Sequence, residues 1–115
     1  MVKRKDSYPI QHREHMRGGD GTAVIEDLLT PAELYEKGRL YAKLTLDPGA
    51  SIGYHVHEGE MESFFIISGE AGFTEGGETV NLYPGDVTLT SSGDGHSIKC
   101  TGNTPLVLIA LILTK

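Results

Sequence analysis

Residues 49–69 read GASIGYHVHEGEMESFFIISG, which brings two histidines and a carboxylate within a short span. His55 and His57 are separated by one residue in a segment with strand character, so both imidazoles are expected on the same face. Residues 58–60 predict a tight turn, after which the next strand returns Glu62 alongside the histidines. Neighbouring strands lie about 4.8 Å apart, so all three side chains can reach one metal ion.

A third imidazole can come from His96, which opens a later predicted strand. Three neutral imidazoles and one carboxylate suit Zn, Cu, Fe, Ni, Co or Mn, and suit Mg or Ca poorly. Four protein ligands leave one or two positions open on a five- or six-coordinate metal, as substrate binding or catalysis requires. A His-x-His pair alone is also common as two exposed histidines on a strand face.

Alternating patterns and turn signals continue on both sides of this stretch. Residues 40–46 are apolar at every second position, so Arg39, Tyr41 and Lys43 should point outward unless a bulge changes the phase. Residues 106–113 are apolar at every position, which suggests a strand buried on both faces. Other short strands are expected at 51–57, 61–68, 79–83, 87–90 and 96–100. The sequence therefore predicts an all-β sandwich or barrel.

One short helix is predicted near the N-terminal end of the strand region. The segment 30–33 (Thr-Pro-Ala-Glu) forms a capping box with proline at the first helical position, and Gly38 is a stop signal. Residues 1–20 are polar and should form an extended arm or a loosely attached strand. We expect a single domain in which residues 1–37, the arm and short helix, pack on a barrel formed by residues 38–115.

Composition excludes several functional classes. The chain has 115 residues and a net charge of −6, and its one basic cluster, Lys3-Arg4-Lys5, is interpreted as a solvated tail rather than a nucleic-acid site. No apolar segment follows that cluster, and the longest apolar run is far shorter than the roughly 20 residues needed to span a membrane. A single cysteine, Cys100, is compatible with a reducing cytoplasm, so a cytoplasmic location is expected.

The spacing of these residues resembles that of the cupin superfamily. Its first signature is matched gap for gap at Gly49, His55, His57, Glu62 and Gly69. Its second, looser signature is resembled by Gly77, Pro84, Gly85 and His96, with a longer loop before His96 and with Cys100 in place of an asparagine. The chain is most similar to small single-domain cupins of the oxalate-decarboxylase-like and germin-like kind. The implied fold is a double-stranded β-helix, or jelly-roll barrel.

The resemblance also implies a site and a function. One divalent transition metal (Mn, Fe, Zn, Ni or Co) would be held by His55, His57, Glu62 and His96. The implied protein is a metalloenzyme of the decarboxylase, dioxygenase or isomerase type, acting on a small carboxylate, keto-acid or sugar-like substrate. The alternative is a non-catalytic protein that binds or senses a metal or small ligand. A homodimer is expected, through residues 106–113 or the N-terminal arm.

The surroundings of the metal are less defined by sequence. The expected pocket lining is Tyr54, Phe64, Ile66, Ile98 and Cys100, although a buried core thiol is the preferred interpretation of Cys100. Tyr54, Cys100, Glu60 and His15 are the candidates for an acid or base, while Glu58 and Glu60 are expected to face solvent. His12 and His15 are interpreted as surface histidines, and no cationic clamp for a carboxylate is assigned.

Overall fold

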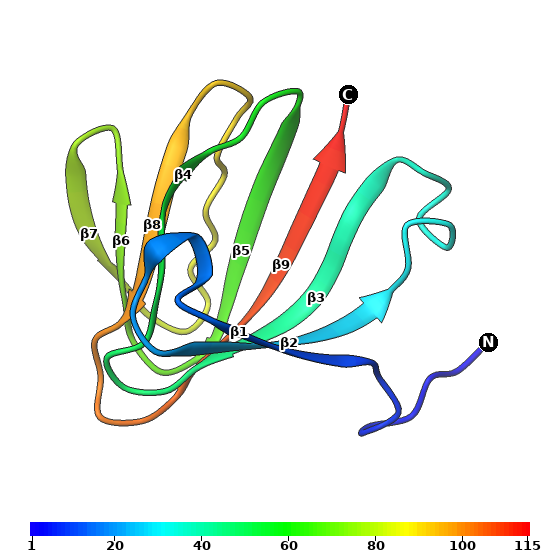
Figure 1. Ribbon diagram of the computed structural model, residues 1–115, viewed down its shortest axis with the longest axis horizontal. Helices are drawn as coiled ribbons and strands as arrows, with labels where there is room; N and C mark the ends of the chain where they lie inside the picture. Colours follow the sequence, from blue (N-terminus) through cyan, green and yellow to red (C-terminus); the bar gives the residue numbers. More distant parts are fainter.

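Nine strands form two antiparallel sheets in the computed structural model, which describes residues 1–115. The larger sheet has the order β1-β2-β3-β9-β5 and the smaller has β4-β8-β6-β7 (Figure 1). The strands are β1 Ile10–Glu14, β2 Thr22–Leu29, β3 Gly38–Leu46, β4 Ser51–Val56, β5 Glu60–Ser68, β6 Ala71–Glu75, β7 Glu78–Leu82, β8 Gly95–Cys100 and β9 Leu106–Thr114. The predicted all-β jelly-roll class is confirmed.

One hydrophobic core of 17 buried residues lies between the sheets. Strand β9 contributes Leu106, Leu108 and Ala110 to this core, and Ile112 is also buried, while the side chains between them are partly exposed. This strand was expected to be buried on both faces. Only its inner face is buried, since no further layer covers the outer face of the larger sheet.

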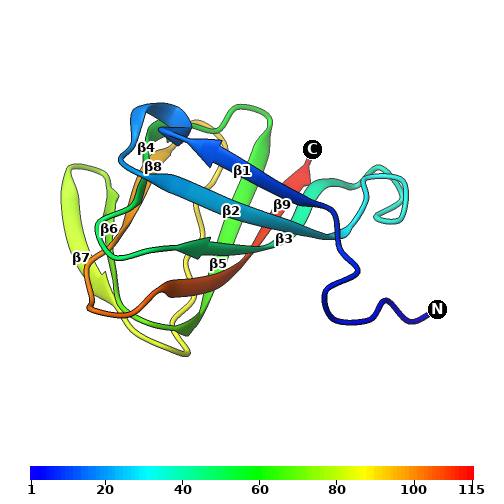
Figure 2. The ribbon, with the colours of Figure 1, turned by 60° about the horizontal axis from the view of Figure 1, so that its bottom comes forward.

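The first 37 residues contribute two strands to the larger sheet. Strand β2 pairs with β3 and places Ala23 and Ile25 in the core, whereas β1 forms the fully exposed edge (Figure 2). A loosely attached strand was expected within residues 1–20, but β2 and β6 were not predicted. Residues 87–90 make only isolated bridges, at Val87 and Thr90, instead of the predicted strand.

The predicted helix after Thr30 is wrong. Its capping box does form, because Glu33 accepts a hydrogen bond from Thr30 N at 2.8 Å and Thr30 Oγ1 accepts one from Glu33 N at 3.2 Å. The turn ends at once, since Tyr35 and Glu36 adopt left-handed backbone angles with φ of 54° and 57°. The one helical element is a short 3-10 turn, η1, at Met16–Gly18. No helix here is long and apolar enough to cross a membrane.

The η1 loop lies directly against the backbone of β4 (Figure 1). A Cβ atom on Gly19 would lie 2.2 Å from Ser51 O, and one on Gly53 would lie 2.1 Å from Arg17 O. Only glycine permits this approach. The contact fixes Arg17, whose own backbone is left-handed with φ 54° and ψ 30°, at one end of the barrel.

Two irregularities decide which side chains enter the barrel. The register of β4 against β8 shifts between Ile52 and His55, so both of these residues face inward. The register of β3 against β9 shifts between Gly38 and Leu40. As a result Arg39, expected to point outward, lines the internal cavity together with Leu40.

Candidate metal centre

Four side chains from three strands and one loop converge inside the barrel. His55 lies on β4, His57 in the loop after it, Glu62 on β5 and His96 on β8, and one ligand atom from each lies within 4.8 Å of the others. His57, Glu62 and His96 have exposures of 2%, 5% and 1%. The turn between β4 and β5 returns Glu62 to the histidines as the sequence predicted.

The facing atoms are close enough to share one ion. Glu62 Oε1 lies 3.0 Å from His57 Nε2 and 2.9 Å from His96 Nε2. The two imidazole nitrogens, His57 Nε2 and His96 Nε2, are 3.1 Å apart. These separations match neighbouring ligands around an ion bound at about 2.0–2.2 Å.

The opposite nitrogen of each imidazole has its own partner. His55 Nδ1 donates to Gly53 O at 2.8 Å, and His57 Nδ1 donates to the Glu60 carboxylate at 2.8 Å. His96 Nδ1 lies 2.7 Å from Thr90 Oγ1. Such partners fix the tautomer of a metal-binding histidine and orient its ring.

The donor set fits a divalent transition metal. Because each Nδ1 carries the proton, the three Nε2 atoms present lone pairs to one another and to the Glu62 carboxylate. Lone pairs this close repel unless a cation lies between them. Imidazole nitrogen and carboxylate oxygen are ligands that Mn, Fe, Co, Ni and Zn accept.

Thr90 links Glu75 to His96 in a chain of hydrogen bonds. Its hydroxyl donates to Glu75 Oε2 at 2.6 Å, which leaves Oγ1 to accept from His96 Nδ1. Two backbone hydrogen bonds with Glu62 hold Thr90, which is fully buried, beside β5. The carboxylate of Glu75 therefore acts on His96 through Thr90.

Replacing Thr90 with valine tests this chain. Valine has a similar shape but cannot accept the hydrogen bond from His96 Nδ1, so we expect metal affinity to fall about 10–100-fold. A competition titration against a chelating dye measures the change. Thr74→Val, which removes an exposed threonine–threonine contact on β6, is the control. Equal affinities for Thr90→Val and wild type would contradict the role of Thr90.

An ion pair between Arg39 and Glu60 lies beside the site. Arg39 donates to both oxygens of Glu60, at 2.6 and 2.8 Å, and these bonds lower the pKa of Glu60 to about 2. Glu60 was expected to face solvent, but it is largely buried between Arg39 and His57. Burial lowers the pKa of His55 from its ordinary value of 6.5, which favours the neutral, metal-binding form.

The lowered pKa of Glu60 predicts a pH dependence of stability. Its folded pKa lies below the ordinary value of 4.5, so the carboxylate stabilises the fold above about pH 4.5 and loses this effect as pH falls through about 2. We expect metal-free wild type to exceed Glu60→Gln in urea midpoint near neutral pH. The difference should shrink with acidification, measured by urea unfolding in EDTA. A difference that stays constant with pH would contradict the assignment.

A cavity of about 410 Å³ adjoins the cluster of His55, His57, Glu62 and His96. His55, His57, Glu62 and Phe64 lie in its wall, and Arg13, Arg17 and Arg39 also line it. Of the other expected pocket residues, Ile66, Ile98 and Cys100 pack in the core. Tyr54 is half exposed, with its ring against Gly95, on the outer side of β4.

Comparison with known proteins places the fold in a family. A cupin domain model matches residues 42–112 of this chain. This chain belongs to the cupin family. The oxalate-binding protein of Thermotoga maritima is 42% identical over 113 residues, which are 98% of this chain and 93% of that protein.

Solved cupin structures agree with this assignment. The crystal structure of a predicted oxalate decarboxylase from Thermotoga maritima matches this cupin with a TM-score of 0.97 and 41% identity, over 100% of both chains. The Schizosaccharomyces pombe Cnp3 cupin domain has a TM-score of 0.74 at 17% identity, covering 91% of this chain and 69% of that one. The second likeness concerns the fold alone.

Several residues at this cupin's site were missed in the sequence. Arg13 and Arg17 were passed over because β1 and η1 carry no strong local signal, and Arg39 was misplaced by the bulge in β3. Glu75 is far from the histidines in sequence, and Thr90, six residues before His96, lies in a segment that was expected to form a regular strand. Glu60 had a usable signal, since it follows His57 by three residues across a tight turn. His12 and His15 lie exposed outside the cluster.

Proposed function

We propose that this cupin holds one divalent transition metal through His55, His57, Glu62 and His96 and binds a small carboxylate on it. The supporting observation is the convergence of three imidazoles, each with its Nδ1 engaged by another group, and one carboxylate beside a cavity. A metal bound there would supply a Lewis-acidic open position for an oxygen ligand. The name of the 42% identical relative, an oxalate-binding protein, supports a carboxylate.

Binding fits the site better than turnover does. The four residues considered as a catalytic acid or base either lie away from the cavity or are bound to other groups. Tyr54 lies on the outer side of β4, Cys100 is in the core, Glu60 is bound to Arg39 and His57, and His15 pairs with Gly19 O at 3.1 Å. None of them lines the cavity.

A metal-dependent enzyme is the second candidate, and Asp27 favours it. This carboxyl group lies in the cavity wall and accepts a hydrogen bond from Gln11 Nε2 at 3.1 Å. It could exchange a proton with a bound ligand. Metal-loaded wild type and Asp27→Asn would be incubated with oxalate and assayed for formate and carbon dioxide. Product from wild type alone would favour catalysis, and unchanged oxalate would favour binding.

Calorimetry tests the proposed binding function. The protein would be loaded with Mn, Fe, Co, Ni or Zn and titrated with oxalate, beside metal-free protein and His57→Ala. We expect oxalate binding only in the metal-loaded wild type. A loaded protein, with about one ion per chain, that gave no binding signal for oxalate or pyruvate would overturn the carboxylate assignment. Failure to load any ion would overturn the metal assignment.

We also propose that a second copy of this chain covers the outer face of the larger sheet. Four large apolar side chains lie together there, on β5 and on the bridged segment beside it: Phe65, Ile67, Val87 and Leu89. The outer side of β9 continues the patch, and the same face on two copies can pair about a two-fold axis. Light scattering should give twice the chain mass of 12.4 kDa, and a monomer would contradict the proposal.

A further inference from the structure

The cavity is larger than a two-carbon acid requires. Its volume of about 410 Å³ equals that of about 14 water molecules, at roughly 30 Å³ each. Oxalate has only six non-hydrogen atoms, so most of this volume would stay filled with water. Cavities of this size commonly bury larger ligands.

Aliphatic side chains line the space beyond the metal ligands. Ile25 from β2, Leu44 from β3, Ile52 from β4 and Ile112 from β9 contribute to this wall. Contact with this apolar surface does not stabilise the oxygen atoms of a ligand. Burying a methylene group against it is favourable by about 0.8 kcal/mol. The middle of the cavity therefore favours a carbon chain.

Two arginines at the mouth are without a carboxylate partner. Arg39 forms a bidentate ion pair with Glu60, so the Glu60 carboxylate balances its charge. Arg13 and Arg17 also line the cavity, yet neither makes an ion pair or a side-chain hydrogen bond in the structure. The Asp27 carboxylate, which also lines the cavity, carries one negative charge and cannot balance the charges of both Arg13 and Arg17.

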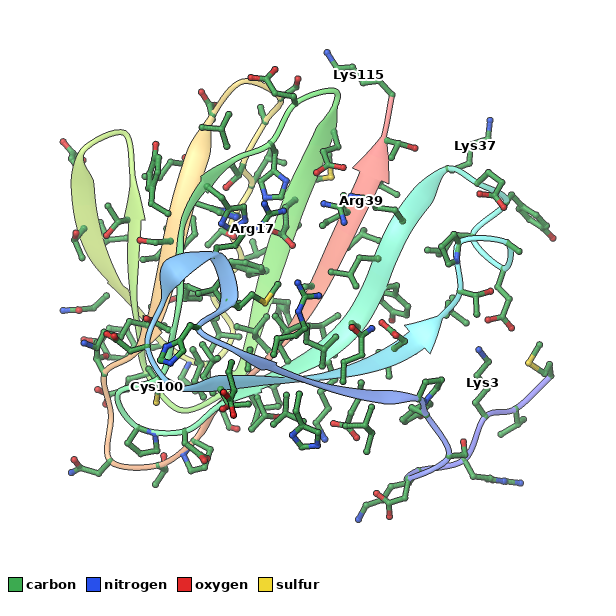
Figure 3. The ribbon with its side chains drawn as sticks, in the orientation of Figure 1. Lys3, Arg17, Lys37, Arg39, Cys100 and Lys115 are labelled. Carbon is green, nitrogen blue, oxygen red and sulfur yellow. The ribbon has the colours of Figure 1, made fainter.

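The chain holds Arg17 in place at an energetic cost. Arg17 and His15 both have left-handed backbones, with φ of 54° and 49°, and such conformations persist where surrounding contacts impose them. The close contact of η1 with Gly53 supplies that constraint. Figure 3 shows Arg17 on the η1 loop and Arg39 on β3, so the two residues come from different parts of the chain.

We propose that this cavity recognises an elongated dianion: a chelating carboxylate head, an aliphatic middle and a second anionic group bound by Arg13 and Arg17. The proposal rests on the metal and carboxylate function argued above, because the metal would hold the head. It assigns the N-terminal segment the selection of the ligand, and it assigns Arg39 the positioning of Glu60 and His57. A longer acid would then bind more tightly than a short one with the same head.

Three 2-oxo acids separate the head, the chain and the tail. Pyruvate supplies the chelating head alone, 2-oxopentanoate adds an apolar chain, and 2-oxoglutarate has the same number of carbons with a carboxylate in place of the terminal methyl group. Calorimetric titration of metal-loaded wild type should give affinities that rise in this order. We expect about ten-fold or more between 2-oxopentanoate and 2-oxoglutarate, because hydrogen bonds to charged groups are strong.

Arginine variants identify the groups that bind the tail. Arg17→Gln and Arg13→Gln should each remove much of the 2-oxoglutarate advantage and leave pyruvate affinity and metal content unchanged. Arg4→Gln, in the polar N-terminal tail and outside the cavity, makes the same charge change as a control. Arg17→Lys should keep part of the affinity that Arg17→Gln loses, and thermal melting checks that each variant is folded.

The outcomes distinguish this inference from the function beneath it. Equal affinity for all three acids in protein that carries metal and binds pyruvate would overturn the elongated dianion alone. An advantage of 2-oxoglutarate that survives in the Arg13→Gln, Arg17→Gln double variant would overturn the assigned residues. Protein that holds metal but binds neither pyruvate nor oxalate would instead overturn the proposed carboxylate function.

Discussion

Replacing His57 with alanine is expected to abolish metal binding at micromolar concentrations of ion. The imidazole is 2% exposed, and its Nε2 lies 3.0 Å from Glu62 and 3.1 Å from His96 Nε2. Its loss removes one of four ligands and leaves Glu60 without its imidazole donor. The loss in affinity should exceed the roughly 10–100-fold that accompanies loss of an outer partner.

A chelator competition titration compares this variant with wild type. His12→Ala is the matched control, because His12 lies exposed on the edge strand β1, away from the four ligands. The control should bind metal as wild type does. If both variants bound equally well, His57 would not be a ligand.

Replacing Phe64 with alanine is expected to destabilise the protein by about 3–5 kcal/mol. Phe64 is 2% exposed and stacks on His96, with ring centroids 5.1 Å apart and planes inclined by 17°. It also meets Phe73 edge-on at 6.2 Å. The vacated volume adjoins both the core and the ligand cluster, so the ring of His96 loses its support.

Urea unfolding of metal-free protein measures this change without the added stability of a bound ion. Tyr83→Ala is the control, since Tyr83 is an aromatic residue with 51% exposure that is not among the four residues of the proposed dimer patch. The loss of stability in this variant should be much smaller. Equal destabilisation by the two substitutions would show that the buried position of Phe64 adds nothing to the free energy of unfolding.

The ligand cluster could be predicted because its spacing is local. His55 lies on β4, His57 directly after that strand and Glu62 on β5, and the short turn between the two strands brings all three together. His96 is distant in sequence; its place at the start of a later strand made it a possible third imidazole, and the cupin resemblance then implied it as a ligand. In the structure it pairs directly with His55 across β4 and β8. The alternation along 40–46 likewise predicted β3, because one face of that strand is buried.

What sequence could not provide depends on contacts between distant segments. The capping box after Thr30 is a correct local signal, but the left-handed residues Tyr35 and Glu36 end the turn before a helix forms. Strand β2 was not predicted, and its pairing with β3 is irregular, with a register shift between Asp27 and Leu29. A further bulge turned Arg39 into the cavity. Single-residue shifts of this kind reverse the face of a side chain without changing local composition.

Metal content measured on untagged protein tests the central claim most directly. Elemental analysis of wild type, as purified and after reconstitution with Mn, Fe, Co, Ni and Zn in turn, should give about one transition-metal ion per chain. That is the expected stoichiometry of four converging ligands. Wild-type protein that retained none of these ions after reconstitution would contradict the metal centre, and the cluster would then be a scaffold feature alone.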